Sequence, residues 1–227
     1  MTDLLLRCRG REQDRLECRE NLGRIASEIT RLRGILQGLL EYARPAGRIL
    51  RPASLNGIVD RTLLLVATQP TFRAIKVIPR MQQPSPVVRT DDRLLQQILV
   101  NVLMNAAQAM PAGGELTLTT QDDSAPEDGD GVTVGRAFPP GDRVAVITVA
   151  DTGPGIPGQD LPRIFEPFFS TKETGKGVGL GLAICHSIIE ELGGAITVQS
   201  RAGLGTTVCI LLPPDGVPVL EASSHGV

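Results

Sequence analysis

The chain has 227 residues, a formal net charge of −2 and a hydrophobic content of 41%, which suits one medium-sized domain with a core and an appendage. The small charge excludes a broad nucleic-acid groove, and the 3% aromatic content excludes stacking platforms for single strands. No apolar run reaches the roughly 20 residues that cross a bilayer, and the first residues lack a signal-peptide core, so we expect a cytoplasmic protein. The 4 cysteines are scattered, which indicates reduced thiols rather than a metal site.

Residues 12–44 predict a long helix with a regular apolar stripe. One helix with so broad a stripe must bury it against another helix, and residues 2–9 offer barely two turns. We therefore expect a homodimer through residues 22–43, with packing of the helix on the body of the domain as the alternative. Pro45 ends the helix, and residues 46–53 follow as a linker. The stripe consists of Leu22, Ile25, Ile29, Leu32, Leu36, Leu39 and Ala43.

The rest of the chain predicts helices alternating with short strands. Ser54 and Asp91 are the expected N-caps of two of these helices. Residues 121–141 are polar, acidic and rich in Gly and Pro, so we expect a mobile hairpin insertion without chemistry. Residues 214–227 have the composition of a disordered tail. The expected elements are helices over 54–69, 91–110 and 183–192, and strands over 74–78, 86–90, 115–120, 143–150, 195–200 and 206–212.

The helix over residues 91–110 carries a polar stripe opposite a broad apolar face. Asn is a poor helix former, so two of them one turn apart in a helix interior need a reason. One reason is a solvated back face. The other is that amide oxygens hold a hard cation beside phosphates. The stripe consists of Gln97, Asn101, Asn105 and Gln108.

Residues 151–182 form the most informative stretch. Asp151 follows a buried strand, and a carboxylate fixed there needs a donor such as the exocyclic amine of adenine. Gly153 and Gly155 let the backbone approach a ligand. A glycine loop over residues 177–182 opens onto a helix N-terminus, where free N–H groups attract phosphate. The loop matches neither a P-loop nor a dinucleotide fingerprint, so flexible surface turns are the alternative.

Four sequence blocks together resemble the N, G1, F and G2 boxes of sensor histidine kinases, which share an ATPase superfamily with gyrase and mismatch-repair ATPases. The blocks are residues 101–106, 151–155, 165–169 and 177–182, in the order and spacing of that family. The helix that ends over residues 39–45 looks like the second helix of the family's dimerisation and phosphotransfer hairpin. The resemblance implies an α+β fold, a two-layer α/β sandwich with a mixed sheet packed on three helices, preceded by a long bundle-forming helix.

The resemblance divides the chain into functional parts. Residues 1–45 would be part of the helical hairpin, and residues 54–213 would be an ATP-binding catalytic domain. In this domain, three phenylalanines within residues 165–169 would anchor a lid that runs to the glycine loop and folds over ATP. Lys172 and Lys176 lie within reach of the phosphates, or are merely solvated.

The resemblance also implies a site for ATP and Mg²⁺. Asp151 would accept a hydrogen bond from the adenine amine, and Thr206 would back the adenine pocket. Asn105 would hold Mg²⁺ against the phosphates, with Asn101 as a further candidate ligand. No residue is assigned as catalytic. The candidate ATP-binding residues are Asn101, Asn105, Asp151, Gly153, Gly155, Ile156, Phe168, Lys172, Lys176, Gly177, Val178, Gly179, Leu180, Gly181, Leu182 and Thr206.

Asn101 stands where hydrolysing relatives carry a Glu that activates water as a general base. An amide cannot take a proton, so we do not expect efficient hydrolysis of ATP. The γ-phosphate should be kept for a positioned nucleophile, and its transfer would depend on alignment and Mg²⁺ electrostatics.

The match fails at the nucleophile, because the family's His-Glu/Asp-x-x-x-Pro motif is absent. His186 is expected to be structural, and His225 lies in the tail. We favour part of a full kinase that phosphorylates an upstream histidine, for relay to a response-regulator receiver domain. The alternatives are a catalytic module that acts on another protein's histidine, a non-catalytic nucleotide-binding interaction module, and a serine kinase of the anti-sigma-factor type. The helix over residues 22–43 disfavours the last.

Overall fold

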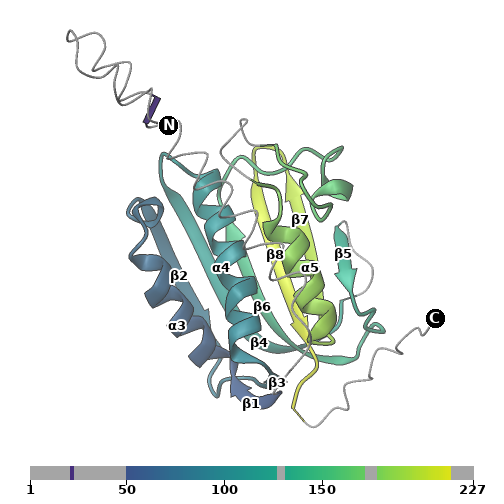
Figure 1. Cartoon of the computed structure of the whole chain (residues 1–227). Coiled ribbons are helices and arrows are strands. Elements are labelled where there is room, and N and C mark those ends of the chain that lie inside the picture. The colour runs from purple at the N-terminus through teal and green to yellow at the C-terminus, as the bar shows by residue number, and fades with distance from the viewer. Residues whose placement is uncertain (1–20, 23–49, 127–130, 172–177, 216–227) are drawn as a thin grey trace, which may run out of the picture.

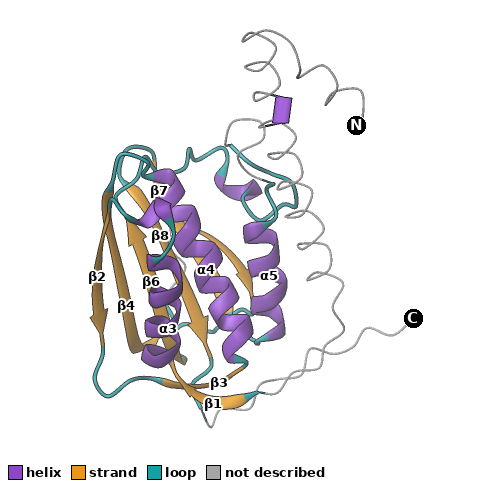
Figure 2. Cartoon of the chain, turned by 60° about the vertical axis from the view of Figure 1, so that its left-hand side comes forward, coloured by secondary structure: helices purple, strands orange, loops and turns teal. Residues whose placement is uncertain are grey.

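The computed structural model describes residues 21–22, 50–126, 131–171 and 178–215. In these residues a six-stranded sheet forms one layer and three helices form the other (Figures 1 and 2). The predicted two-layer α/β sandwich, with a mixed sheet packed on helices, is therefore confirmed. The helices are α3 (Leu55–Ala67), α4 (Asp92–Ala109) and α5 (Gly181–Glu191), with short 3-10 helices η1 (Pro70–Phe72) and η2 (Leu161–Arg163).

The large sheet has the strand order β2-β4-β6-β8-β7-β5. Strands β2 and β4 are parallel, and every other neighbouring pair is antiparallel. Strand β6 lies between β4 and β8, and its apolar run is buried from Val144 to Ile147, on both faces of the sheet. This explains why its sequence is continuously apolar instead of alternating. The strands are β2 (Ile75–Met81), β4 (Gly114–Ser124), β5 (Val132–Gly135), β6 (Arg143–Asp151), β7 (Ala195–Arg201) and β8 (Gly205–Leu212).

A second, two-stranded sheet pairs β1 (Arg51–Ser54) with β3 (Val87–Thr90) in antiparallel orientation. Residues 51–53 were expected to be linker, and the structure makes them part of β1 instead. Pro214 bridges to Val88, and the N–H of Asp215 donates to the carbonyl oxygen of Val87 at 2.9 Å, so the first two residues of the expected tail pair with β3. Neither pairing has a signal in the local sequence, because each depends on a partner far along the chain.

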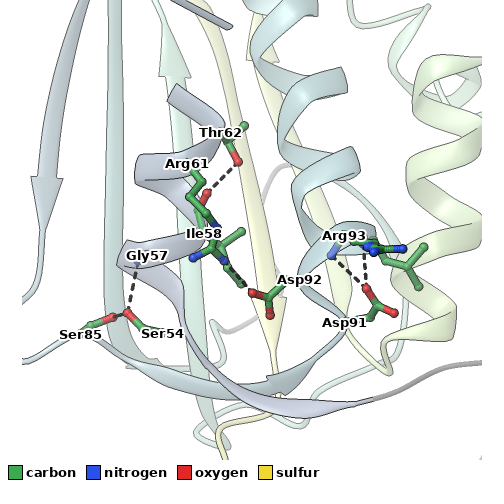
Figure 3. A network of polar contacts seen from close by, with 10 residues as sticks. Ser54, Gly57, Ile58, Arg61, Thr62, Ser85, Asp91, Asp92 and Arg93 are labelled. Carbon is green, nitrogen blue, oxygen red and sulfur yellow. Dashed lines mark hydrogen bonds and ion pairs between the residues drawn. The ribbon is translucent and has the colours of Figure 1, made fainter. Parts of the chain in front are cut away.

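Two predicted capping residues begin the first two helices of the layer (Figure 3). The Ser54 side chain accepts a hydrogen bond from the N–H of Gly57 at 3.2 Å. Oδ1 of Asp91 accepts from two N–H groups in the first turn of α4, at 2.9 and 3.4 Å. An exposed ion pair of 2.6 Å joins Arg61 of α3 to Asp92 of α4, and its exposure limits its contribution to stability. The caps set where α3 and α4 begin on the sheet.

The core lies between the helix layer and the sheet. Helix α4 lies between α3 and α5, so its broad apolar face packs on the sheet while its flanks meet both neighbours (Figure 2). Cys185 belongs to this core as a free thiol, as expected for a small apolar residue. The largest fully buried side chains are those of Leu55, Ile58, Leu95, Ile98, Leu99, Leu103, Leu116, Leu118, Ile147, Ile189, Leu192 and Ile196.

The prediction for residues 121–141 is partly wrong. Strand β4 continues to Ser124, and residues 132–135 form the edge strand β5, which pairs with β7. Val132 and Val134 of β5 pack against the main core, while Thr133 points to the other face and meets Thr197 at 3.0 Å. This alternation is a strand pattern, but it spans only four residues and is hidden by the surrounding Gly and Asp.

The predicted long helix over residues 12–44, and the dimer expected through residues 22–43, fall almost wholly outside the described residues. Residues 21–22 are described, and they are helical. Within the described part of the chain, no helix combines the length and apolar character that spanning a membrane requires.

We expect Leu103→Ala to lower the free energy of unfolding by about 2–5 kcal/mol, because it leaves a cavity in a fully buried part of α4. Leu64→Ala on α3 is the matched control, because Leu64 is 74% exposed and the same atoms are removed from a helix. Urea unfolding at equilibrium measures both changes. Equal losses for the two variants would contradict the assignment of the core.

Candidate functional site

Asp151 ends strand β6 and lies in a row of residues that face the helices. Its direct partners are Leu116 on β4 and Thr206 on β8, and Thr206 is the direct partner of Ser200 on β7. Directly opposite residues of antiparallel strands point to the same face of a sheet, and Leu116 is buried in the core that the helices cover. The side chains of Asp151, Thr206 and Ser200, which we name the polar row, therefore point toward the helix layer.

The Asp151 carboxylate is half-buried and bound on one side only. Its Oδ1 accepts hydrogen bonds from the N–H groups of Gly153, at 2.8 Å, and Thr206, at 3.3 Å. Burial raises the pKa of the carboxyl above its ordinary value, and these two hydrogen bonds lower the pKa in part. No hydrogen bond from a described residue reaches Oδ2, so this oxygen keeps its acceptor capacity for an outside donor.

The loop after Asp151 packs tightly against the turn between β7 and β8. Gly155 has a φ of +70°, and a Cβ there would collide with the carbonyl oxygen of Arg201. Gly205 has a φ of +94°, and a Cβ there would collide with the carbonyl oxygen of Asp151. Gly155 was expected to make room for a ligand, but in the structure it makes room for the β7–β8 turn.

Ser200 joins the loop, the turn and the polar row through a single oxygen. Its Oγ accepts a hydrogen bond from the N–H of Ile156 at 2.8 Å and donates to the carbonyl oxygen of Gly205 at 2.9 Å. The same Oγ lies 2.9 Å from Oγ1 of Thr206. Sequence reasoning did not find Ser200, because only the register of β7 on β8 brings it next to Thr206.

The polar stripe of α4 faces α5 at two of its positions. The Asn101 side chain donates from Nδ2 to the carbonyl oxygen of Gly181 at 3.4 Å. A Cβ at Gly181 would lie 3.8 Å from Nδ2 of Asn105, so α5 begins directly against this stripe. Asn101 and Asn105 are only partly exposed, whereas Gln108 is exposed. A solvated back face therefore describes the end of the stripe but not its two asparagines.

Asn101 also contacts the buried face of α5. Its side chain is hydrogen-bonded to the Cys185 thiol, and burial raises the pKa of that thiol to about 12. A cysteine with so high a pKa stays protonated and unreactive at neutral pH. Asn101 thus joins α4 with α5.

Asp151 and Asn105 lie at the same end of the molecule. A Cβ at Gly153 would lie 3.5 Å from Cβ of Ala109 and 3.3 Å from Cγ of Met110, so the end of α4 touches the loop after Asp151. Asn105 is four residues before Ala109, which is about one helical turn. The carboxylate and the amide stripe therefore border one region, between the end of β6 and the start of α5.

The backbone of Phe168 meets that of Gly179. The N–H of Phe168 donates to the carbonyl oxygen of Gly179 at 2.9 Å, and a Cβ at Gly179 would lie 2.6 Å from Phe168 C. Phe168 has a φ of +68° and its side chain is 63% exposed, whereas Phe165 is buried. A left-handed, exposed phenylalanine is uncommon and marks a backbone held by this crossing. The segment between Phe168 and Gly179 is thus closed at its base, and its members Lys172, Lys176 and Gly177 lie outside the described residues.

His186 has structural contacts, as predicted. Its ring meets the ring of Phe165 edge-on, with 6.0 Å between the centroids. Its Nε2 lies 3.3 Å from Oε1 of Glu190, one turn further along α5. These contacts hold the buried start of the phenylalanine segment against α5.

The N-terminus of α5 has no side-chain cap. Leu180 occupies the N-cap position without a side-chain hydrogen bond, and the first helical bond runs from the N–H of Ile184 to the carbonyl oxygen of Leu180 at 2.9 Å. The N–H groups of residues 181–183 precede that bond and have no carbonyl partner within the helix. Such N–H groups at the positive end of a helix suit an anion. Val178 and Leu182, at either side of this start, are half-buried.

The described residues contain no group of three or more His, Cys, Asp or Glu side chains that could hold a metal ion. The amide oxygen of Asn105 is the type of ligand that Mg²⁺ accepts, but one such ligand does not make a site. A Mg²⁺ ion fits here only together with oxygens from a phosphate ligand.

Comparisons with known proteins agree with this geometry. The family model described as histidine kinase-, DNA gyrase B- and HSP90-like ATPase matches residues 90–216. The sensor histidine kinase ZraS of Escherichia coli is 34% identical over 189 residues, which are 83% of this chain and 36% of ZraS. The chain thus spans about a third of that relative's length.

Two solved structures extend the match. Full-length ShkA in complex with AMPPNP aligns with a TM-score of 0.64 and 26% identity, over 91% of this chain and 41% of ShkA. Histidine kinase ThkA in complex with the response regulator protein TrrA aligns with a TM-score of 0.62 and 26% identity, over 86% of this chain and 50% of that chain. The chain belongs to the family of histidine kinase-, DNA gyrase B- and HSP90-like ATPases, and it contains the ATP-binding catalytic domain of the sensor histidine kinase type.

Proposed function

We propose that the chain binds ATP with Mg²⁺ and is the catalytic part of a protein-histidine kinase. It transfers the γ-phosphate to a histidine, for relay to an aspartate of a response-regulator receiver domain. The observation that carries the proposal is the Asp151 carboxylate, which keeps Oδ2 available while the loop after it touches the end of α4, about one helical turn from Asn105. Two relatives support it, because ShkA was solved with AMPPNP and ThkA with a response regulator.

The adenine end of the proposed site is the polar row. Oδ2 of Asp151 accepts a hydrogen bond from the exocyclic amine, and Thr206 lies beside it on β8. Gly153 fits this role because a Cβ there would lie 2.8 Å from Oδ1 of Asp151 and crowd the carboxylate. Gly155 and Ile156 act indirectly by fixing the loop against β7 and β8.

The phosphate end of the proposed site is the start of α5. The N–H groups of residues 181–183 bind phosphate oxygens. The sequence motif alone assigns the lid residues Lys172, Lys176 and Gly177 to phosphate binding as well. Asn105 holds Mg²⁺ together with phosphate oxygens, and the bound ion neutralises charge on the triphosphate. Asn101 acts as a helix-to-helix contact more than as a metal ligand.

The proposed chemistry is phosphoryl transfer by alignment. Asn101 stands where a general base would be needed for hydrolysis, and its amide is neutral and bound to Gly181. The γ-phosphate is therefore kept for an incoming histidine. Neither His186 nor His225 lies in a His-Glu/Asp-x-x-x-Pro motif, so we propose an acceptor outside the given sequence. In this assignment residues 54–213 are the catalytic domain, and residues 22–43 are the dimerising second helix of the hairpin.

We expect Asp151→Asn to weaken the binding of adenine nucleotides by at least about tenfold. An Asn side chain has one acceptor oxygen and one NH₂ group. If the oxygen faces the N–H groups of Gly153 and Thr206, the NH₂ group opposes the adenine amine. The opposite orientation sets the NH₂ group against the two backbone donors. Isothermal titration calorimetry with ATP measures the change.

Asp142→Asn is the control for this variant, because Asp142 is exposed and directly precedes β6, at the end of the strand away from the polar row. It should bind ATP as the unchanged protein does. Unaltered ATP affinity in folded Asp151→Asn would remove the adenine assignment.

The raised pKa of Asp151 predicts a pH-dependent stability difference. A carboxyl whose pKa is higher in the folded than in the unfolded state stabilises the fold fully below its unfolded pKa, and the stabilisation is lost as pH rises through the folded pKa. Without nucleotide, Asp151→Asn should therefore gain stability relative to the unchanged protein as pH rises through that window. The ordinary pKa of Asp is about 4, so the measurement starts there. Thermal unfolding of both proteins between about pH 4 and 8 gives the difference in stability, and a difference that falls as pH rises would contradict the prediction.

We expect Asn105→Ala to weaken Mg-dependent ATP binding by about tenfold or more and to leave AMP binding unchanged. AMP lacks the terminal phosphates that share the metal, so it reports the adenine end alone. Gln108→Ala is the matched control, because Gln108 is an exposed member of the same stripe. Normal MgATP affinity in Asn105→Ala would show that this amide holds no metal.

A further inference from the structure

We propose that Ser200 is a positioning residue that selects purines carrying an amine at position 6, because it directs the hydroxyl proton of Thr206 away from the nucleotide. The inference rests on the proposed binding of ATP beside Asp151. It concerns a side chain that makes no proposed contact with the nucleotide itself.

The direction of the Thr206 hydroxyl follows from the contacts of Ser200. Two of the three contacts at Ser200 Oγ have a fixed direction, because the N–H of Ile156 must donate and the carbonyl of Gly205 must accept. The single proton of Ser200 is used on Gly205. The third contact, 2.9 Å from Oγ1 of Thr206, is then a hydrogen bond only if Thr206 is the donor.

A hydroxyl whose proton is committed presents only lone pairs to its other neighbours. Thr206 is the direct cross-strand partner of Asp151, so the two side chains lie side by side on the same face of the sheet. Asp151 Oδ2 is an acceptor, and Thr206 Oγ1 becomes a second acceptor beside it. The polar row therefore offers no side-chain donor to the purine.

Two adjacent acceptors fit an amine, which has two hydrogens to donate. They repel a keto oxygen at the same position, as found in hypoxanthine and guanine. Without Ser200, the Thr206 hydroxyl is free to rotate and donate its proton to such an oxygen. The Asp151 carboxylate already favours an amine over a keto oxygen at this position. Because of Ser200, the Thr206 side chain adds to the same preference.

The test compares the dissociation constants of ATP and ITP, which carries a keto group in place of the amine. We expect Ser200→Ala to lower the preference for ATP over ITP by about fivefold to tenfold. Loss of the Ile156 contact also loosens the loop, but that change lowers the affinities for ATP and ITP by the same factor. Ser200→Thr keeps the hydroxyl and is the rescue variant, which should restore the preference.

The double variant Ser200→Ala/Thr206→Val adds a second check. The effect of Ser200→Ala should disappear when position 206 no longer carries a hydroxyl, because no proton remains to be directed. If Ser200→Ala fails to fold, Thr206→Val alone should lower the preference, since it removes the second acceptor. Calorimetry with ATP and ITP gives the ratio of the two dissociation constants for each variant, and circular dichroism reports whether the variant is folded.

An unchanged or increased preference for ATP in folded Ser200→Ala would overturn the inference. A difference in preference between Thr206→Val and the double variant would overturn it as well. In either case an unchanged protein that binds ATP leaves the proposed function standing. If the unchanged protein itself binds neither ATP nor ITP, the proposed function fails, and the inference fails with it.

Discussion

A half-buried carboxylate needs hydrogen-bond donors, and Asp151 finds them in two backbone N–H groups that belong to different parts of the chain. One is in the loop that follows Asp151, and the other is in β8. Because both donors reach Oδ1, the loop and the strand are fixed relative to each other while Oδ2 remains available. Gly155 and Gly205 permit this arrangement, since a side chain at either position would collide with the opposite backbone. The proposed recognition of adenine thus depends on how closely two backbones pack.

Helix α4 supplies the other side of the site and is also the central helix of the core. Its apolar face packs on the sheet through residues such as Leu99 and Leu103, and this packing sets the rotation of the helix about its axis. That rotation in turn aims Asn101 and Asn105 at the start of α5. Stability and the proposed function therefore share one element, and a change that rotates α4 affects both.

Much of the fold could be predicted from the sequence, because helix periodicity, capping residues and apolar strand runs are local signals. Local motifs also predict Asp151 and Asn105 as candidate site residues, and the structure places both at one end of the molecule. The features that the sequence did not predict depend on pairing between segments that are far apart in the chain. Strand β5 is four residues long within a Gly- and Asp-rich segment, and only its pairing with β7 makes it a strand. Ser200 becomes part of the site only through the register of β7 on β8, which no local pattern encodes.

The central claim is that the Asp151 carboxylate and the Asn105 amide bind opposite ends of one nucleotide. A crystal structure of the chain with Mg²⁺ and a non-hydrolysable ATP analogue measures this most directly. We expect the exocyclic amine at about 2.8–3.2 Å from Oδ2 of Asp151, and a Mg²⁺ ion at about 2.1 Å from the side-chain oxygen of Asn105. An analogue bound elsewhere, or bound with its purine away from Asp151, would contradict the account.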